Sequence, residues 1–177
     1  MKRIAQFHKV SFQQFKDGWV DTFGEMTDDE IQCIYDNIKL PKRATKGSAG
    51  YDFYLPCDLS LRPGEIAKIP TGIRVEMEDD WVLKLYPRSG LGFKYRLQLN
   101  NTVGIIDSDY FHSDNEGHIF CKITYDMTQG KNLELNQGDA FIQGIFLEYG
   151  ITVDDDASAT RNGGFGSTSK NQEGKEE

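Results

Sequence analysis

The feature that most constrains the fold is a change in the spacing of apolar residues near Leu40. Before this point, apolar residues recur with helical spacing; beyond it they alternate with polar ones, as in half-buried β-strands. Alternating stretches begin at Tyr51, Trp81, Tyr95 and Ile119, with turn signals at 62–64, 100–101 and 136–139. Many short strands at this spacing predict an all-β sandwich or barrel.

The first forty residues predict a strand within 1–10 followed by two short helices. Ser11 and Gln14 fit a capping box, and Thr27 and Glu30 repeat that pattern. Gly18 is placed to end the first of these helices. We therefore expect one β-domain over 1–153 that carries a helical insertion at 11–38, and we see no catalytic chemistry in the insertion.

Composition predicts a globular chain and argues against several functions. The 177 residues, 38% hydrophobic and 27% charged, suit one ordinary domain, and a net charge of -8 disfavours a nucleic-acid-binding surface. Three cysteines without CxxC spacing indicate neither a disulfide framework nor a zinc site, so a cytoplasmic location is expected. The sequence has no long apolar run or signal peptide, so no membrane association is expected.

The C-terminal segment RNGGFGST, residues 161–168, combines groups suited to a nucleotide. Arg161 offers a fork for phosphate oxygens and Phe165 a flat face for a base, while the glycines allow close approach of the backbone. The same composition is also typical of a disordered terminus. We expect 154–177 to form a flexible arm.

Three internal segments could bind anions, although each also fits an ordinary turn or surface position. Asp52 in AGYD is a candidate partner for an arginine. Arg88, Ser89 and Gly90 in PRSGLG could hold phosphate oxygens in a glycine-opened loop, or could form a plain β-turn. Gln143 in GDAFIQ could donate an amide hydrogen to an anion.

The segment from Asn100 to Tyr110 is the strongest internal signal. A hairpin-like turn leads into an apolar strand that ends at Asp107, with Tyr110 three residues beyond. A carboxylate sheltered by Ile105 and Ile106 could orient and deprotonate a water. A strand-ending turn acid is the alternative. The histidines, His8, His112 and His118, share no ligand or triad spacing, so they are assigned no role.

These segments occur in one order, AGYD, PRSGLG, GIIDSDY, GDAFIQ and RNGGFGST, and that order resembles the five motifs of the trimeric deoxyuridine triphosphatases (dUTPases) from about residue 40 to about residue 170. The resemblance implies a jelly-roll-like β-fold, assembled as a homotrimer with three shared active sites. It also implies hydrolysis of dUTP to dUMP and pyrophosphate.

The resemblance gives the candidate residues their roles. Asp107 would activate the attacking water and contact the sugar 3′-hydroxyl, Tyr110 would pack under the deoxyribose, and Asp52 would be an architectural acid near Arg88. Residues expected to read the uracil edge are Asn101, Gly104 and Ile106. Those expected to hold phosphates are Arg88, Ser89, Gly90 and Gln143. Those expected to close over the ligand are Arg161, Phe165, Gly166, Ser167 and Thr168.

A triphosphate carries roughly four negative charges, so an acidic chain needs a divalent ion; we expect Mg²⁺ held by the phosphates and water, with no direct protein ligands. The chain departs from the family pattern at Ala140, where an arginine is usual, at Ser169, where a glycine is usual, and in a lengthened loop over 111–116.

Two other functions remain open from the sequence. A dCTP deaminase shares the fold and several motifs, but the residues before Asp107 include no histidine or glutamate. A regulatory nucleotide-binding protein that acts through a partner is supported only by the helical insertion and the long loop.

Overall fold

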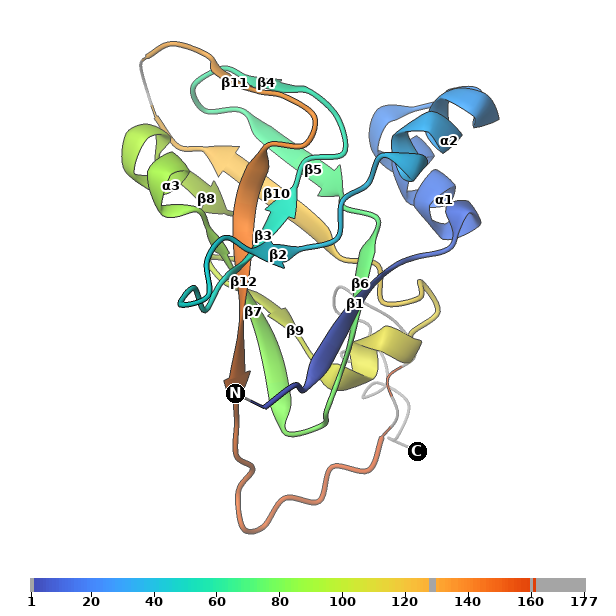
Figure 1. Cartoon of the computed structure of the whole chain (residues 1–177), viewed down its shortest axis with the longest axis vertical. Coiled ribbons are helices and arrows are strands. Elements are labelled where there is room, and N and C mark those ends of the chain that lie inside the picture. Colours follow the sequence, from blue (N-terminus) through green and yellow to red (C-terminus); the bar gives the residue numbers. More distant parts are fainter. Residues whose placement is uncertain (1, 128–129, 160, 162–177) are drawn as a thin grey trace, which may run out of the picture.

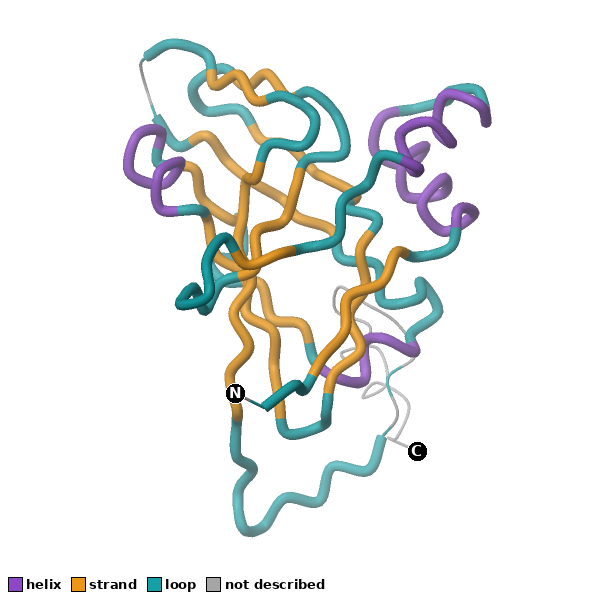
Figure 2. Tube along the Cα trace, viewed as in Figure 1, coloured by secondary structure: helices purple, strands orange, loops and turns teal. Residues whose placement is uncertain are grey.

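The computed structural model describes residues 2–127, 130–159 and 161, and its strands pair in antiparallel fashion (Figures 1 and 2). The largest sheet has the order β2 (Lys42–Arg43), β3 (Tyr51–Tyr54), β12 (Ala140–Glu148), β7 (Trp81–Pro87) and β9 (Gly104–Ile106). A second sheet has the order β5 (Ile66–Pro70), β10 (Phe120–Tyr125) and β8 (Leu97–Leu99). Two-stranded pairs are β1 (Ala5–Lys9) with β6 (Ile73–Met77), and β11 (Leu133–Leu135) with β4 (Leu59–Leu61). The predicted all-β fold class is confirmed.

Alternation of buried and exposed side chains explains why the sheets pack as they do. In β10, Cys121, Ile123 and Tyr125 are buried, whereas Lys122 points to solvent. The same core includes Phe15 from the N-terminal helices, so the helical insertion and the sheets share one hydrophobic cluster. Burial of these apolar side chains provides the main stabilisation of the fold.

The two N-terminal helices are α1 (Phe12–Phe23) and α2 (Asp28–Asp36), which lie together beside the sheets in Figure 1. Thr27 and Glu30 form the predicted capping box, and Ser11 caps α1. The prediction that Gly18 ends the first helix was wrong, because α1 continues to Gly24, whose φ of 87° ends it. Gly18 is buried within the helix, where a Cβ would lie 2.7 Å from Phe120 Cζ. The glycine therefore allows close packing rather than helix termination.

The segment after β7 also differs from its predicted conformation. Ser89 begins a short helix, α3 (Ser89–Tyr95), where a glycine-opened loop or a β-turn was expected. Tyr95 is accordingly the last residue of α3, and the strand begins only at Leu97. Arg96 joins the two with a φ of 49°, and its backbone N–H donates to Gly92 O at 3.0 Å. Local helical hydrogen bonds therefore shift the start of the predicted strand from Tyr95 to Leu97, and Leu97 and Leu99 keep the predicted alternation in β8.

A 3₁₀ helix, η1 (Ser108–His112), follows β9. After β12 the chain runs through an irregular stretch, 149–159, and returns toward η1, as Figure 1 shows. This return brings Arg161 next to the end of β9. The boundaries of the single β-domain and the arm stay predictions, and the residues after Arg161 lie outside the described part. No helix among the described residues is long and apolar enough to cross a bilayer.

Candidate active site

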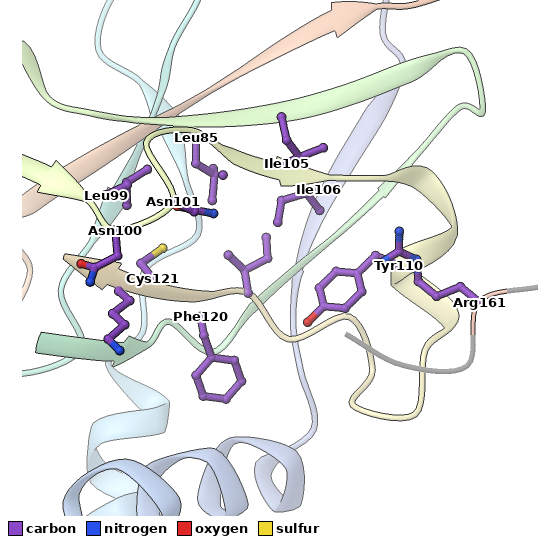
Figure 3. A pocket seen from close by; sticks show the side chains of 13 residues that line it. Leu85, Leu99, Asn100, Asn101, Ile105, Ile106, Tyr110, Phe120, Cys121 and Arg161 are labelled. Carbon is purple, nitrogen blue, oxygen red and sulfur yellow. The ribbon is translucent and has the colours of Figure 1, made fainter. Parts of the chain in front are cut away.

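A cavity of about 440 Å³ opens between the 100–104 hairpin, β9, β10 and η1 (Figure 3). Its lining residues are Leu85, Leu99, Asn100, Asn101, Gly104, Ile105, Ile106, Tyr110, Ile119, Phe120, Cys121, Lys122 and Arg161. The structure thus brings five of the predicted site residues to one place: Asn101, Gly104, Ile106, Tyr110 and Arg161.

The hairpin at one end of the cavity is held by backbone hydrogen bonds. The N–H of Thr102 donates to Leu99 O at 2.9 Å, and Thr102 has a φ of 67°. Asn101 is exposed at the turn. Gly104 begins β9 against Leu85, where a Cβ would lie 2.9 Å from Leu85 Cβ, so any other residue would push the hairpin from the sheet. Backbone groups can therefore face the cavity in a fixed arrangement.

Asp107 lies directly after β9, at the other end of the same strand, and is the N-cap residue of η1. Its carboxylate forms an ion pair with the guanidinium of Arg161, which also contacts Asp109 Oδ1 through Nε at 2.9 Å. The Asp107 side chain is 45% exposed, so water can reach it. Asp107 is not itself among the lining residues, but it follows the lining residue Ile106, and a partly exposed carboxylate at such a position can accept a proton from a bound water.

Tyr110 closes the cavity beside Arg161, as Figure 3 shows. The Arg161 guanidinium carbon lies 5.8 Å from the centre of the tyrosine ring. The phenol is buried, and this burial raises the pKa of Tyr110, so its hydroxyl stays protonated at neutral pH. The ring is thus a neutral, fixed wall of the cavity.

Three of the four predicted phosphate-binding residues line a second cavity, of about 530 Å³, rather than the first. Arg88, Ser89 and Gly90 line it together with Lys94 and Ala140. Arg88 Nε forms an ion pair with Asp52 Oδ1 at 3.1 Å, which places Asp52 beside Arg88 as expected. The Asp52 side chain is 16% exposed, so water screens this contact less than it screens a surface pair.

Gln143 lies opposite Asp52 in the pairing of β12 with β3. Its amide nitrogen donates to Pro87 O at 3.2 Å, and it does not line the second cavity. Phe165, Gly166, Ser167 and Thr168 lie outside the described residues, so their roles stay predictions.

Two residues near the first cavity were missed by sequence reasoning. Asn115 donates a hydrogen bond to the Tyr110 hydroxyl at 2.8 Å. His118, assigned no role from its spacing, is fully buried and accepts a hydrogen bond from Gly72 N–H at Nε2 at 2.9 Å. Neither residue has a recognisable local sequence pattern. Their hydrogen-bond partners, Tyr110 and Gly72, are brought near them only by the tertiary fold.

The fold and the site define an all-β protein whose first cavity has no carboxylate among its described lining residues but is flanked by Asp107, directly after β9. A family model described as dUTPase matches residues 36–169, which is most of the chain. The chain belongs to the dUTPase family. The predicted family and the predicted class of enzyme are thereby confirmed.

Individual relatives agree with this membership. The chain is 40% identical over 144 residues to a deoxyuridine 5′-triphosphate nucleotidohydrolase of Lactococcus lactis subsp. lactis, with 78% of this chain and 95% of that protein covered. Among solved structures, dUTPase from Streptococcus mutans matches with a TM-score of 0.58 and 36% identity, covering 68% of this chain and 91% of that one. The dUTPase of phage phi11 of S. aureus matches in fold with a TM-score of 0.60 and 19% identity, covering 89% and 97%.

Proposed function

We propose that the protein hydrolyses dUTP to dUMP and pyrophosphate, with Asp107 activating the water that attacks the α-phosphorus. The observation that carries this proposal is the position of Asp107, at the end of β9, beside a cavity lined by Asn101 and Tyr110. A carboxylate at this position can take the proton of a water while the nucleoside fills the cavity. Such a reaction would limit uracil in DNA and supply dUMP for dTMP synthesis.

The first cavity suits the uracil and the deoxyribose. The hairpin that includes Asn101, together with backbone groups of Gly104 and Ile106, can pair with the uracil edge, and a cytosine would leave some of these groups unpaired. Tyr110 forms a wall against the sugar. Because this ring is buried and held at its hydroxyl, it leaves little room for a 2′-hydroxyl.

The phosphates would be bound by Arg88, Ser89 and Gly90, with Gln143 as a further donor. The cavity that Arg88 lines has no lining residue in common with the nucleoside cavity. This separation supports a homotrimer in which neighbouring chains complete each active site. Two strongly exposed apolar side chains, Phe93 on α3 and Ile105 in the nucleoside cavity, also favour an assembly that covers them.

The site suits a divalent ion that arrives bound to the phosphates of the substrate. The described residues include no group of three histidine, cysteine, aspartate or glutamate side chains that could hold a metal. Phosphate oxygens and water would therefore supply most of the ligands of Mg²⁺. When bound, Mg²⁺ offsets negative charge on the phosphate oxygens.

Arg161 would contribute positive charge to the outer phosphates after leaving its ion pairs with Asp107 and Asp109. Phe165 would then stack on the uracil, with Gly166, Ser167 and Thr168 closing over the triphosphate. We further propose a cytoplasmic enzyme that binds neither nucleic acid nor membrane, in keeping with its net charge of -8.

The test is chromatography of the products formed from dUTP, dCTP, dTTP and UTP in the presence of Mg²⁺. The proposal predicts dUMP and pyrophosphate from dUTP, with the other nucleotides poor substrates. Formation of dUTP or dUMP from dCTP would instead indicate a deaminase. Binding of dUTP without turnover would indicate a regulatory protein. A Phe165→Ala variant with unchanged turnover would contradict the role of the arm.

A further inference from the structure

The hydroxyl of Tyr110 is held by two hydrogen bonds of opposite sense. It donates to the backbone carbonyl of His118 at 2.8 Å and accepts from the side-chain amide of Asn115, also at 2.8 Å. The phenol proton is therefore committed to His118, and a second partner has to be a donor. Asn115 supplies that donor from the loop that follows η1.

The orientation of the Asn115 amide is itself fixed by its neighbours. Its side-chain oxygen accepts from the backbone N–H of Gly117 at 3.3 Å, and it lies 2.8 Å from the Ser113 hydroxyl, which shares its one proton with Tyr110 O at 2.7 Å. Because the N–H of Gly117 can only donate, the oxygen of Asn115 faces it and the nitrogen is directed to the phenol. Gly117 has a φ of 70°, and a Cβ there would lie 2.7 Å from Tyr110 O, so the loop can approach η1 this closely only with glycine.

We propose that Asn115 is a positioning residue that sets the discrimination between deoxyribonucleotides and ribonucleotides. This inference rests on the proposed function, in which Tyr110 packs against the deoxyribose. A ring whose hydroxyl is anchored by two hydrogen bonds, to His118 and from Asn115, cannot rock away from the sugar. A ring that has lost one of these hydrogen bonds can shift enough to admit the 2′-hydroxyl of a ribonucleotide. A binding pocket selects ligands by shape only while the side chains that line it stay rigid.

Asn115→Asp tests this role with little change in size. The carboxylate keeps an oxygen to accept from Ser113 and Gly117, so the support of the loop is retained. It has no donor for the phenol, so Tyr110 either faces a repelling oxygen or turns its proton away from His118. In both cases the ring loses one of its two anchors.

The readout is the ratio of kcat/KM for dUTP to kcat/KM for UTP. For Asn115→Asp we expect this ratio to fall about fivefold, which corresponds to the ~1 kcal/mol of one hydrogen bond. The change should come mainly from a larger kcat/KM for UTP. Glu116→Gln is the matched control, since it loosens the same loop without touching the phenol, and it should leave the ratio unchanged.

A double-mutant cycle separates positioning from general loosening of the loop. Tyr110→Phe removes the hydroxyl, so it should lower the ratio by itself, and Asn115→Asp should add nothing in that background. The inference is overturned if Tyr110→Phe retains full discrimination, or if Asn115→Asp lowers the ratio equally in both backgrounds. A wild-type protein that turns over no dUTP would instead overturn the proposed function, and this inference with it.

Discussion

Glu116 accepts two hydrogen bonds from Ser11, a residue 105 positions earlier in the chain. The backbone N–H of Ser11 lies 2.7 Å from Oε2 and its hydroxyl 2.6 Å from Oε1. Ser11 is the N-cap of α1, so the loop after η1 binds the first turn of the helical insertion. The insertion and the nucleoside cavity are therefore joined through one short loop.

Removal of this contact should weaken the fold without removing the active site. For Glu116→Ala we expect the free energy of unfolding to fall by about 1–2 kcal/mol, because Ser11 loses an acceptor for both of its donors. Urea unfolding followed by circular dichroism measures the loss. Glu25→Ala, at an exposed position before α2, should change stability much less. Equal stability of the two variants would show that the contact between Glu116 and Ser11 does not stabilise the fold.

The free energy of unfolding should fall as the pH is lowered, because His118 is buried in its neutral form. Burial lowers the pKa of His118 from 6.5 to about 3. The unfolded chain then binds a proton at this position below about pH 6.5, whereas the folded chain does not, so stability present above that pH is lost as the pH falls toward about 3. Between about pH 7.5 and about pH 5.5, above the range of ordinary carboxyl groups, we expect a loss of roughly 1 kcal/mol.

Urea unfolding at the two pH values tests this, with His118→Gln and the exposed His112→Gln compared in parallel. The pH-dependence should shrink in His118→Gln and persist in His112→Gln. A persistent slope in His118→Gln would assign the effect to another group.

Gly18→Ala should destabilise the protein, although alanine is the better helix former by about 1 kcal/mol. The new Cβ would meet Phe120 Cζ at 2.7 Å and His118 Cε1 at 3.1 Å. Displacing these rings should cost more than the helix gains, about 1–3 kcal/mol in total. Thermal unfolding measures the shift in Tm, with Gly47→Ala as a control because nothing lies within 4 Å of that site. A raised Tm for Gly18→Ala would show that the rings of Phe120 and His118 move aside at little cost in free energy.

Asp52→Asn should weaken substrate binding while leaving the fold intact. Asp52 orients Arg88 through an ion pair at 3.1 Å, and the amide replaces it with a weaker contact. We expect KM for dUTP to rise roughly three- to tenfold with a smaller change in kcat, as when about 1 kcal/mol of uniform binding is lost. Steady-state kinetics provide the test, with Glu65→Gln, from the exposed pair with Arg62, as a control. An unchanged KM would show that Asp52 has no role in substrate binding.

Alternation predicted the strands best where one face is buried, as in β10 and β7, and it failed where local hydrogen bonds compete. The predicted alternation begins at Tyr95, but Tyr95 is the last residue of α3, so the strand itself starts only at Leu97. The short strands β2, β4 and β11 were not predicted, since two or three residues carry too little pattern to be recognised. Gly18 was misassigned because its role depends on Phe120, a hundred residues away.

The nucleoside cavity was predictable only in part: the lining residues between Asn100 and Tyr110 come from one continuous segment, whereas the others come from β7, β8, β10, the loop before β10 and Arg161. The ion pair between Asp52 and Arg88 was also anticipated, from the order of the motifs. The network around Asn115 and His118 was not, because it depends on tertiary contacts of a loop with no recognisable pattern. The segment after Arg161 was predicted from composition and motif alone and stays a prediction.

The most direct test of the central claim compares Asp107→Asn with Asp109→Asn. Both remove one carboxylate that contacts Arg161, but only Asp107 is proposed to take the proton of the attacking water. With dUTP and Mg²⁺, kcat should fall about a hundredfold to ten-thousandfold for Asp107→Asn, and less than about tenfold for Asp109→Asn, with both variants folded. Wild-type kcat in Asp107→Asn, or an equal loss in both variants, would contradict the assignment of the base.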